Sequence, residues 1–193
     1  MNDFVVVGNT NAVTYKEVFP LIKDGKVRLG YCANKTVEYQ LPEQYEKWDR
    51  IEDGKKYGKV PAVSWFTTFP VKKRPLILSK TYDPDKYPHY DNYDAIEVSR
   101  VNDIPKDYDG AMGVPISYLG KHNPKQFEIL GIACGNSWAN YTDFLKSLNF
   151  NPEIKYGGGL GSTVLGGKGL YARILIRKVK ELPTEEEVKN IAE

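Results

Sequence analysis

The sequence predicts an α/β fold at its start that passes into a mixed α+β region after about residue 60. The run Phe4-Val5-Val6-Val7-Gly8 is apolar without polar alternation, which is typical of a strand buried on both faces of a parallel sheet. A helix signal and a second strand follow this run directly, which indicates a β-α-β opening. The later strands are short and turn-forming residues separate them, which favours a mixed arrangement.

A capping box predicts the first helix. Thr14 and Glu17 have the spacing of this motif, in which each side chain bonds a backbone N–H near the start of a helix. Pro20 should kink or shorten the helix, and Gly25 should end it. The segment KVRLGY at 26–31 alternates polar and apolar residues, so we expect a half-buried strand there.

Similar local patterns predict the secondary structure of the rest of the chain. Residues 32–59 are polar and irregular, with a short helix expected over 42–48. The expected later elements are strands at 60–69, 75–80, 95–99, 126–134 and 170–178, a helix over 136–148 and a solvated helix over 185–192. We therefore expect an α/β part at 1–70, an α+β region at 71–182 and a tail at 183–193.

The composition of the 193 residues is that of an ordinary globular protein, with 41% hydrophobic and 27% charged residues. The net charge of +2 excludes a grossly basic nucleic-acid binder but allows a local basic face. Cys32, Cys134, His89 and His122 lack the spacing of a metal site, so we expect no metal. Neither a secretory signal nor a membrane-spanning stretch is evident, and free thiols fit a cytoplasmic location.

Asn9 and Asn11 follow the first predicted strand. Ligands bind outside the carboxyl ends of strands in open parallel sheets, and carboxamides there can donate and accept hydrogen bonds. Asn also supports tight turns by bonding its own backbone, and turns at strand ends are commoner than sites. From the residues alone the turn interpretation is favoured, and a site remains the alternative.

Two sets of cations are candidates for contact with nucleic acid. Lys72, Lys73 and Arg74 are adjacent and could reach a phosphate backbone from a turn, or form a solvated hairpin tip. Arg173 and Arg177 lie four residues apart on a predicted strand, so they share a face. That face could meet DNA, or it could pack through the aliphatic stems of the arginines.

A tyrosine-rich loop covers residues 81–94. Tyr82, Tyr87, Tyr90 and Tyr93 alternate there with aspartates, whose charge would repel phosphates. We expect this loop to pack on itself or to contact protein.

Four segments together resemble a known family. They are VVVGNTNAVTYKEVFPLIKDGKVRLGY, SWFTTF followed by KKRPL, MGVPISYLGKHNPKQFEILGIACGN, and LYARILIRK. In this order they are similar to blocks of the EcoRI-type adenine-specific DNA methyltransferases, which transfer a methyl group from S-adenosylmethionine to adenine N6. The resemblance covers about residues 2–178, although Thr68 and Phe69 depart from the Trp-Phe-Thr-Asn-Leu pattern of the second block.

Two motifs of that family are missing. The family has a glycine-containing loop for the cofactor and an Asn-Pro-Pro-Phe-type tetrapeptide for the target amine, both upstream of the first shared block. The stretch Asn123–Phe127 has the wrong spacing, and the glycine-rich loop at 157–169 does not lie between a buried strand and a helix. The resemblance therefore implies the C-terminal part of a Rossmann-like methyltransferase sheet followed by a target-recognition region.

The resemblance also sets the expected site and partners. Asn9, Asn11 and Thr14 would lie at the rim of the active site, with no catalytic or cofactor-binding residue in this chain. S-adenosylmethionine would bind the complete enzyme and not this chain alone. The partners would be double-stranded DNA and either the missing N-terminal half or a second copy paired through an exposed sheet edge. The alternative is a stand-alone DNA-binding or protein-interaction module without catalysis.

Overall fold

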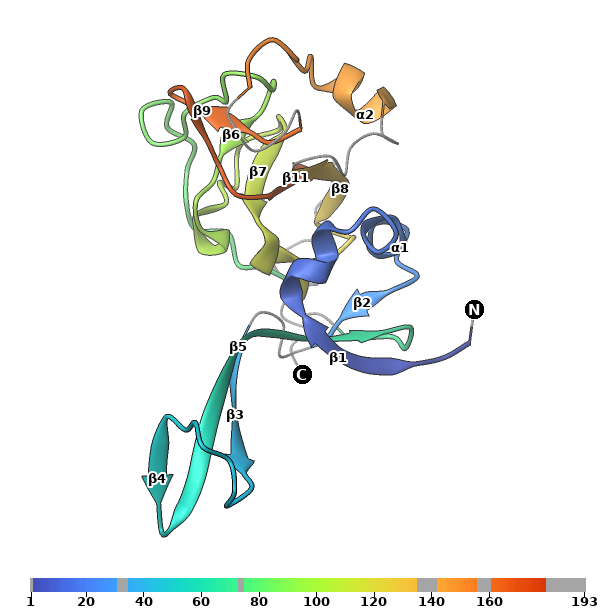
Figure 1. The fold of residues 1–193 in the computed structure, drawn as a ribbon. Helices are drawn as coiled ribbons and strands as arrows, with labels where there is room; N and C mark the ends of the chain where they lie inside the picture. The colour runs from blue at the N-terminus through green and yellow to red at the C-terminus, as the bar shows by residue number, and fades with distance from the viewer. Residues whose placement is uncertain (1, 31–34, 73–74, 135–141, 156–160, 180–193) are drawn as a thin grey trace.

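The computed structural model describes residues 2–30, 35–72, 75–134, 142–155 and 161–179. Figure 1 shows two main groups of strands, with the 3-10 helix η1 and the helix α1 lying between them, and an arm that extends away from the rest of the protein. The predicted combination of α and β structure is confirmed.

The first sheet has the strand order β1-β5-β2, and both outer strands run antiparallel to β5. β1 and β2 therefore run parallel to each other with β5 between them. The bounds of these elements are β1 (Val5–Asn9), η1 (Thr10–Thr14), α1 (Phe19–Lys23), β2 (Arg28–Leu29) and β5 (Lys55–Thr67). The β-α-β order predicted from the sequence is present, but a strand from later in the chain separates its two strands.

The prediction that the first strand is buried on both faces of a parallel sheet is wrong. Val5, Val6 and Val7 are 52%, 48% and 50% exposed, and their strand is antiparallel to its neighbour. The reason is the position of β1 at the edge of the sheet. Among the described residues only β5 pairs with it, so half of its apolar surface has nothing to pack against.

The first helix also differs from the prediction. Thr14 ends η1 instead of opening a helix, and its hydroxyl donates to the carbonyl of Asn11. α1 begins at Phe19, so Pro20 lies in its first turn, where a missing N–H costs nothing. Gly25 follows the helix with φ +66°, a left-handed conformation that favours glycine, so the predicted helix end is confirmed.

The arm replaces the predicted irregular segment and its short helix over 42–48. It consists of β3 (Lys35–Leu41), β4 (Arg50–Glu52) and the first half of β5, and β3 and β4 each pair antiparallel with β5. A bulge at Pro61 and Ala62 marks where the arm leaves the body, because two residues of β5 oppose one of β3 and Ala62 has φ +54°. Proline is tolerated within a strand at such a bulge.

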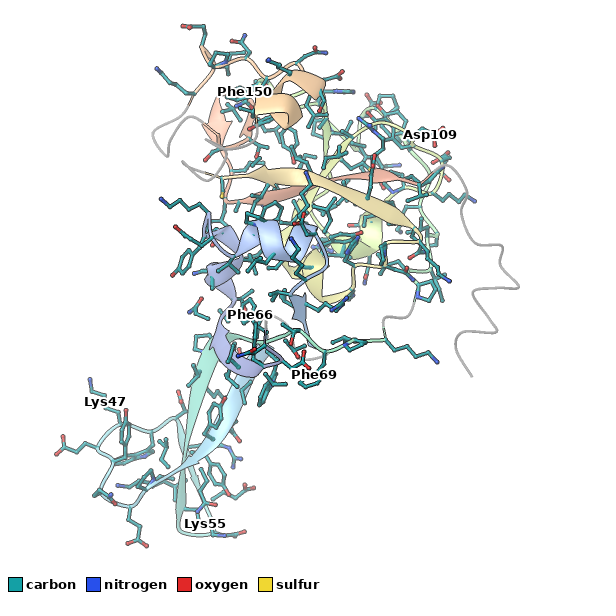
Figure 2. The ribbon with its side chains drawn as sticks, turned by 90° about the vertical axis from the view of Figure 1, so that its right-hand side faces the viewer. Lys47, Lys55, Phe66, Phe69, Asp109 and Phe150 are labelled. Carbon is teal, nitrogen blue, oxygen red and sulfur yellow. The ribbon has the colours of Figure 1, made fainter. Side chains whose placement is uncertain are left out.

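Each face of the arm has its own packing. On one face the Arg50 guanidinium bonds Glu38 and Glu52 and stacks over the Tyr57 ring at 4.3 Å. On the other, the Lys56 ammonium lies 4.4 Å from the Trp48 ring centre. Figure 2 shows Lys47 and Lys55 on the arm, with Phe66 and Phe69 where it joins the body. These contacts stabilise a structure that would be marginal as an isolated hairpin.

The second sheet has the order β6-β7-β11-β8. Its strands are β6 (Ile96–Glu97), β7 (Met112–Pro115), β8 (Phe127–Ala133) and β11 (Arg173–Lys178). The strands predicted at 95–99, 126–134 and 170–178 are confirmed, whereas β7 was missed within a turn-rich segment. The strand predicted at 75–80 is wrong, because the Gln126 side chain bonds both the N–H and the C=O of Leu76 in place of a neighbouring strand.

Short elements complete the fold. They are η2 (Val101–Asp103), η3 (Ile116–Gly120), α2 (Thr142–Ser147), β9 (Val164–Leu165) and β10 (Lys168–Gly169). α2 lies within the range of the helix predicted over 136–148, and residues 136–141 lie outside the described residues. The helix predicted over 185–192 and the tail at 183–193 lie outside the described residues.

One continuous core joins the two sheets. Val13, Phe19 and Leu29 from the first part pack in the same buried cluster as Ile132 and Ile174 from the second sheet. A second cluster contains the buried rings of Tyr90 and Tyr93 together with Ala133, Leu145 and Leu175, so the tyrosine loop packs against the rest of the protein, one of the two predicted alternatives. The division of the chain near residue 70 stays a prediction. In the described part of the chain, no helix is both long and apolar enough to cross a membrane.

Candidate functional site

Asn9 lies at the end of β1 and caps η1. Its carboxamide oxygen accepts a 2.8 Å hydrogen bond from the backbone N–H of Asn11, which confirms the turn interpretation. The neighbouring Thr10 is fully buried, and its hydroxyl bonds the Ala62 carbonyl at 2.8 Å and the Ser64 hydroxyl at 2.7 Å. These bonds hold the end of β1 against the bulge in β5. The second role predicted for Asn9, at the rim of a site, stays a prediction.

Asn11 is held from the other part of the protein. The Tyr171 hydroxyl donates to its Oδ1 at 2.8 Å, across 160 positions of sequence. The carbonyl of Asn11 accepts from the Thr14 hydroxyl at 2.9 Å. The three predicted rim residues therefore lie on one short segment, with Asn9 and Asn11 exposed and Thr14 half-buried.

A buried ion pair lies directly after Tyr171 in the chain. The Arg173 Nε and Nη2 atoms each donate to Glu97 at 3.0 Å, and the side chains are only 15% and 5% exposed. The Tyr90 hydroxyl also donates to Glu97. A third guanidinium nitrogen, Nη1, donates to the Tyr171 carbonyl at 2.8 Å, so the ion pair fixes the backbone that carries Tyr171.

The ionisation of these groups follows from burial and charge. Burial raises the pKa of the Tyr90 phenol, and the nearby negative charge of Glu97 and the hydrogen bond to it raise this pKa further. Burial is the largest single effect on Arg173 and lowers its pKa, but the hydrogen bonds to Glu97, the charge of Glu97 and the interactions with Tyr90 together raise the pKa overall. A Cβ at Gly113 would lie 2.0 Å from the Tyr90 oxygen, so this strand position requires glycine.

The two predicted arginines on β11 have different surroundings. Arg173 uses its guanidinium on Glu97 and on backbone carbonyls, which fits the packing alternative better than contact with phosphate. Arg177 is 40% exposed and lies 3.6 Å from Glu128, at a position open to solvent. Both were predicted as DNA contacts, and of the two only Arg177 has a guanidinium accessible to a phosphate.

A cavity of about 360 Å³ lies where α1, β2 and the turn after η3 meet. Its lining includes Lys23, Arg28 and His122, together with one carboxylate, that of Asp24. Val71 also lines it, so Lys72 is adjacent in sequence to this basic hollow. Lys73 and Arg74, predicted to act with Lys72, lie outside the described residues.

Sequence reasoning missed the basic hollow. The alternation in KVRLGY placed Arg28 on the polar face of a strand, and that signal could have identified it. Nothing in the order of residues indicated that Lys23 and Arg28 would lie near the 70s segment. In the described ranges, no group of three His, Cys, Asp or Glu side chains is arranged to hold a metal ion.

Comparison with known proteins identifies the family. The model of the family described as "Adenine-specific methyltransferase EcoRI" matches residues 1–179. The type II methyltransferase M.EcoRI of Escherichia coli is 42% identical over 136 residues, which cover 66% of this chain and 42% of that protein. Type II methyltransferase M.MpnI of Mycoplasma pneumoniae is 34% identical over 185 residues, covering 91% of this chain and 56% of that protein.

A third relative, type II methyltransferase M.MgeORF184P of Mycoplasma genitalium, is 32% identical over 185 residues, with the same coverage of 91% and 56%. This chain thus spans about half the length of the curated relatives that it matches. No solved structure matches it significantly. Because the family model covers nearly the whole chain, the chain belongs to the EcoRI family of adenine-specific methyltransferases.

Proposed function

We propose that this chain is the C-terminal portion of an S-adenosylmethionine-dependent N6-adenine DNA methyltransferase of the restriction-modification type, acting in the cytoplasm. In this proposal it completes the catalytic sheet and contributes a surface that faces DNA. Family membership supports the reaction class. The chain matches only about half of each relative, which supports a proposal in which another portion of the enzyme carries the remaining functions.

The open edge of β1 is the observation that carries the proposal. β1 and β2 run parallel on either side of the antiparallel β5, and α1 lies between them in sequence. This arrangement suits the end of a larger Rossmann-like sheet in which further strands continue beyond β1. Val5, Val6 and Val7 are half-exposed there, and a neighbouring strand would cover them.

Catalysis is assigned to the portion of the enzyme that this chain does not include. The sequence has no Asn-Pro-Pro-aromatic tetrapeptide to hold a flipped adenine. We therefore expect calorimetric titration with S-adenosylmethionine to show no stoichiometric binding, and a methylation assay to show no transfer to adenine in duplex DNA. Tight binding with turnover would contradict the proposal, because the active site would then lie within these 193 residues.

The DNA-facing surface is proposed to include the basic hollow and Lys72. Lys23, Arg28 and Val71 line the hollow. Lys72 is the next residue in the sequence after Val71. Cations grouped in this way position a protein on phosphates without reading sequence. Arg177, whose side chain is partly exposed on β11 in the second sheet, is a further candidate.

Salt dependence tests this surface. If about three phosphates are contacted, the logarithm of the DNA association constant should fall against the logarithm of salt concentration with a slope of about −2.7. Lys72→Ala should make the slope shallower by about 0.9, because one fewer counterion is released. Fluorescence anisotropy with a labelled duplex measures both values. Lys168→Ala, which removes an exposed lysine in β10, serves as the control and should leave the slope unchanged; a flat response of the unaltered chain would rule out the basic surface.

The second candidate function is a stand-alone interaction module, and the arm favours it. Tyr39, Tyr45 and Trp48 are 42%, 53% and 46% exposed, and they line a groove of about 280 Å³. Exposed Trp and Tyr are enriched where proteins bind one another. Reading the coding frame upstream of Met1 separates the candidates. An in-frame Asn-Pro-Pro-aromatic motif supports the methyltransferase portion, and a start signal without one supports the module.

A further inference from the structure

We infer that Tyr171 orients Asn11 so that the rim of the proposed site presents hydrogen-bond donors, and that Asn11 therefore recognises an acceptor on DNA. This inference rests on the proposed function, since it takes the end of β1 as the DNA-facing rim. A carboxamide has an oxygen that accepts and an NH₂ group that donates, so which end faces outward decides what it can bind.

The side-chain oxygen of Asn11 already accepts one hydrogen bond. Tyr171 donates to Oδ1 at 2.8 Å, and the backbone N–H and C=O of Asn11 bond Asn9 and Thr14. Among the described residues, the Nδ2 atom of Asn11 is its one polar group without a hydrogen-bond partner, and the residue is exposed. Two N–H donors therefore face solvent.

Asn9 presents the same polarity. Its Oδ1 accepts from a backbone N–H, which can only donate, so the amide of Asn9 must also direct its NH₂ group outward. Each of the two oxygens already accepts one hydrogen bond, and the NH₂ groups of both side chains are the donors they direct to solvent. The N6 amine of adenine is itself a donor, so the outward NH₂ groups of this rim do not match it. They suit phosphate oxygens, or base acceptors such as N7 and O6 in the major groove.

The anchor of Tyr171 lies in the other part of the protein. Arg173 donates to the Tyr171 carbonyl at 2.8 Å and is itself held by the buried Glu97. The orientation of Asn11 at the end of the first sheet thus depends on an ion pair in the second sheet. Tyr171 is a positioning residue in this scheme, because it acts through Asn11.

Three variants of the full chain test the polarity, with anisotropy of a labelled duplex as the measurement. Asn11→Ala removes the donors and should weaken binding about 3- to 10-fold. Asn11→Asp keeps the bond from Tyr171 but turns an oxygen outward, and it should weaken binding about 10-fold more than Asn11→Ala. Asn151→Asp, which adds the same charge at an exposed turn, is the control and should change binding less than about 3-fold.

A double-mutant cycle tests the positioning role. Tyr171→Phe should weaken binding about 2- to 5-fold in the original chain and have no further effect in Asn11→Ala, because its effect passes through Asn11. Equal effects in both backgrounds would overturn the role of Tyr171. Asn11→Asp that binds no worse than Asn11→Ala would overturn the donor assignment.

The remaining outcomes separate this inference from the proposed function. If the unaltered chain binds no duplex, the proposed DNA-facing role fails and the inference fails with it. If it binds but the Asn11 variants match it, only the inference fails. Losses of equal size on three duplexes of unrelated sequence identify a phosphate acceptor, and losses that differ between the duplexes identify a base edge.

Discussion

Glu97→Gln should lower the free energy of unfolding by about 3 kcal/mol. The substitution keeps the shape of the side chain but leaves the Arg173 guanidinium, only 15% exposed, without its counter-charge. Breaking a buried pair by removing one partner is costly because the remaining charge is desolvated and no longer has an opposite charge to compensate for that loss. The midpoint and slope of urea unfolding, followed by circular dichroism, give the change.

A second ion pair, whose arginine lies on β11 like Arg173, offers a control for this prediction. Glu128 pairs with Arg177, but at 3.6 Å and with both side chains about half-exposed, at 53% and 40%. Glu128→Gln should therefore cost less than about 1 kcal/mol. Adding Arg173→Met to Glu97→Gln should recover part of the loss, since no unpaired guanidinium then remains. Equal stability of Glu97→Gln and the unaltered chain would show that the ion pair does not stabilise the second sheet.

The exposed edge of β1 should make the isolated chain self-associate. Three half-exposed valines on an edge strand with one described neighbour present both apolar surface and unpaired backbone groups. We expect light scattering at high concentration to give twice the monomer mass, and Val6→Lys to restore the monomer mass. A lysine on an edge strand opposes pairing because its charge must stay hydrated.

A matched substitution shows which surface is responsible. Val60 is 49% exposed, close to the 48% of Val6, but it lies on the arm, in a strand paired with β3. Val60→Lys should leave the association unchanged. If Val60→Lys abolishes the dimer and Val6→Lys does not, the arm and not β1 is the interface. A monomer at all concentrations would contradict self-pairing altogether.

Local patterns in the sequence predicted several elements correctly. The alternation in LYARILIRK and the apolar run in QFEILGIAC identified β11 and β8, because both strands carry enough β-branched and apolar residues to specify a strand without outside help. Gly25 identified the end of α1 through its left-handed conformation. Motif spacing was less reliable, since Thr14 and Glu17 have the capping-box spacing but form no capping box.

The candidate site was predictable only in part. Asn9 and Asn11 were identified by their place after a strand, but the partner of Asn11 lies 160 residues away and no pattern near either residue indicates it. Likewise, the predicted strand at 75–80 failed because a side chain from residue 126 took the place of a neighbouring strand. Long-range hydrogen bonds of this kind depend on how the two sheets pack.

By itself the sequence determined the family, the mixed α/β class and the strongly patterned strands. Each of these can be recognised from short sequence patterns, whose residues are near one another in the chain. Only the tertiary structure decided that β5 separates β1 from β2, that the segment after β2 forms an arm, and that Arg173 is buried while Arg177 is partly exposed. The physical reason is that burial and pairing are set by which distant segments meet, and the same arginine can bind a carboxylate or face water according to that choice.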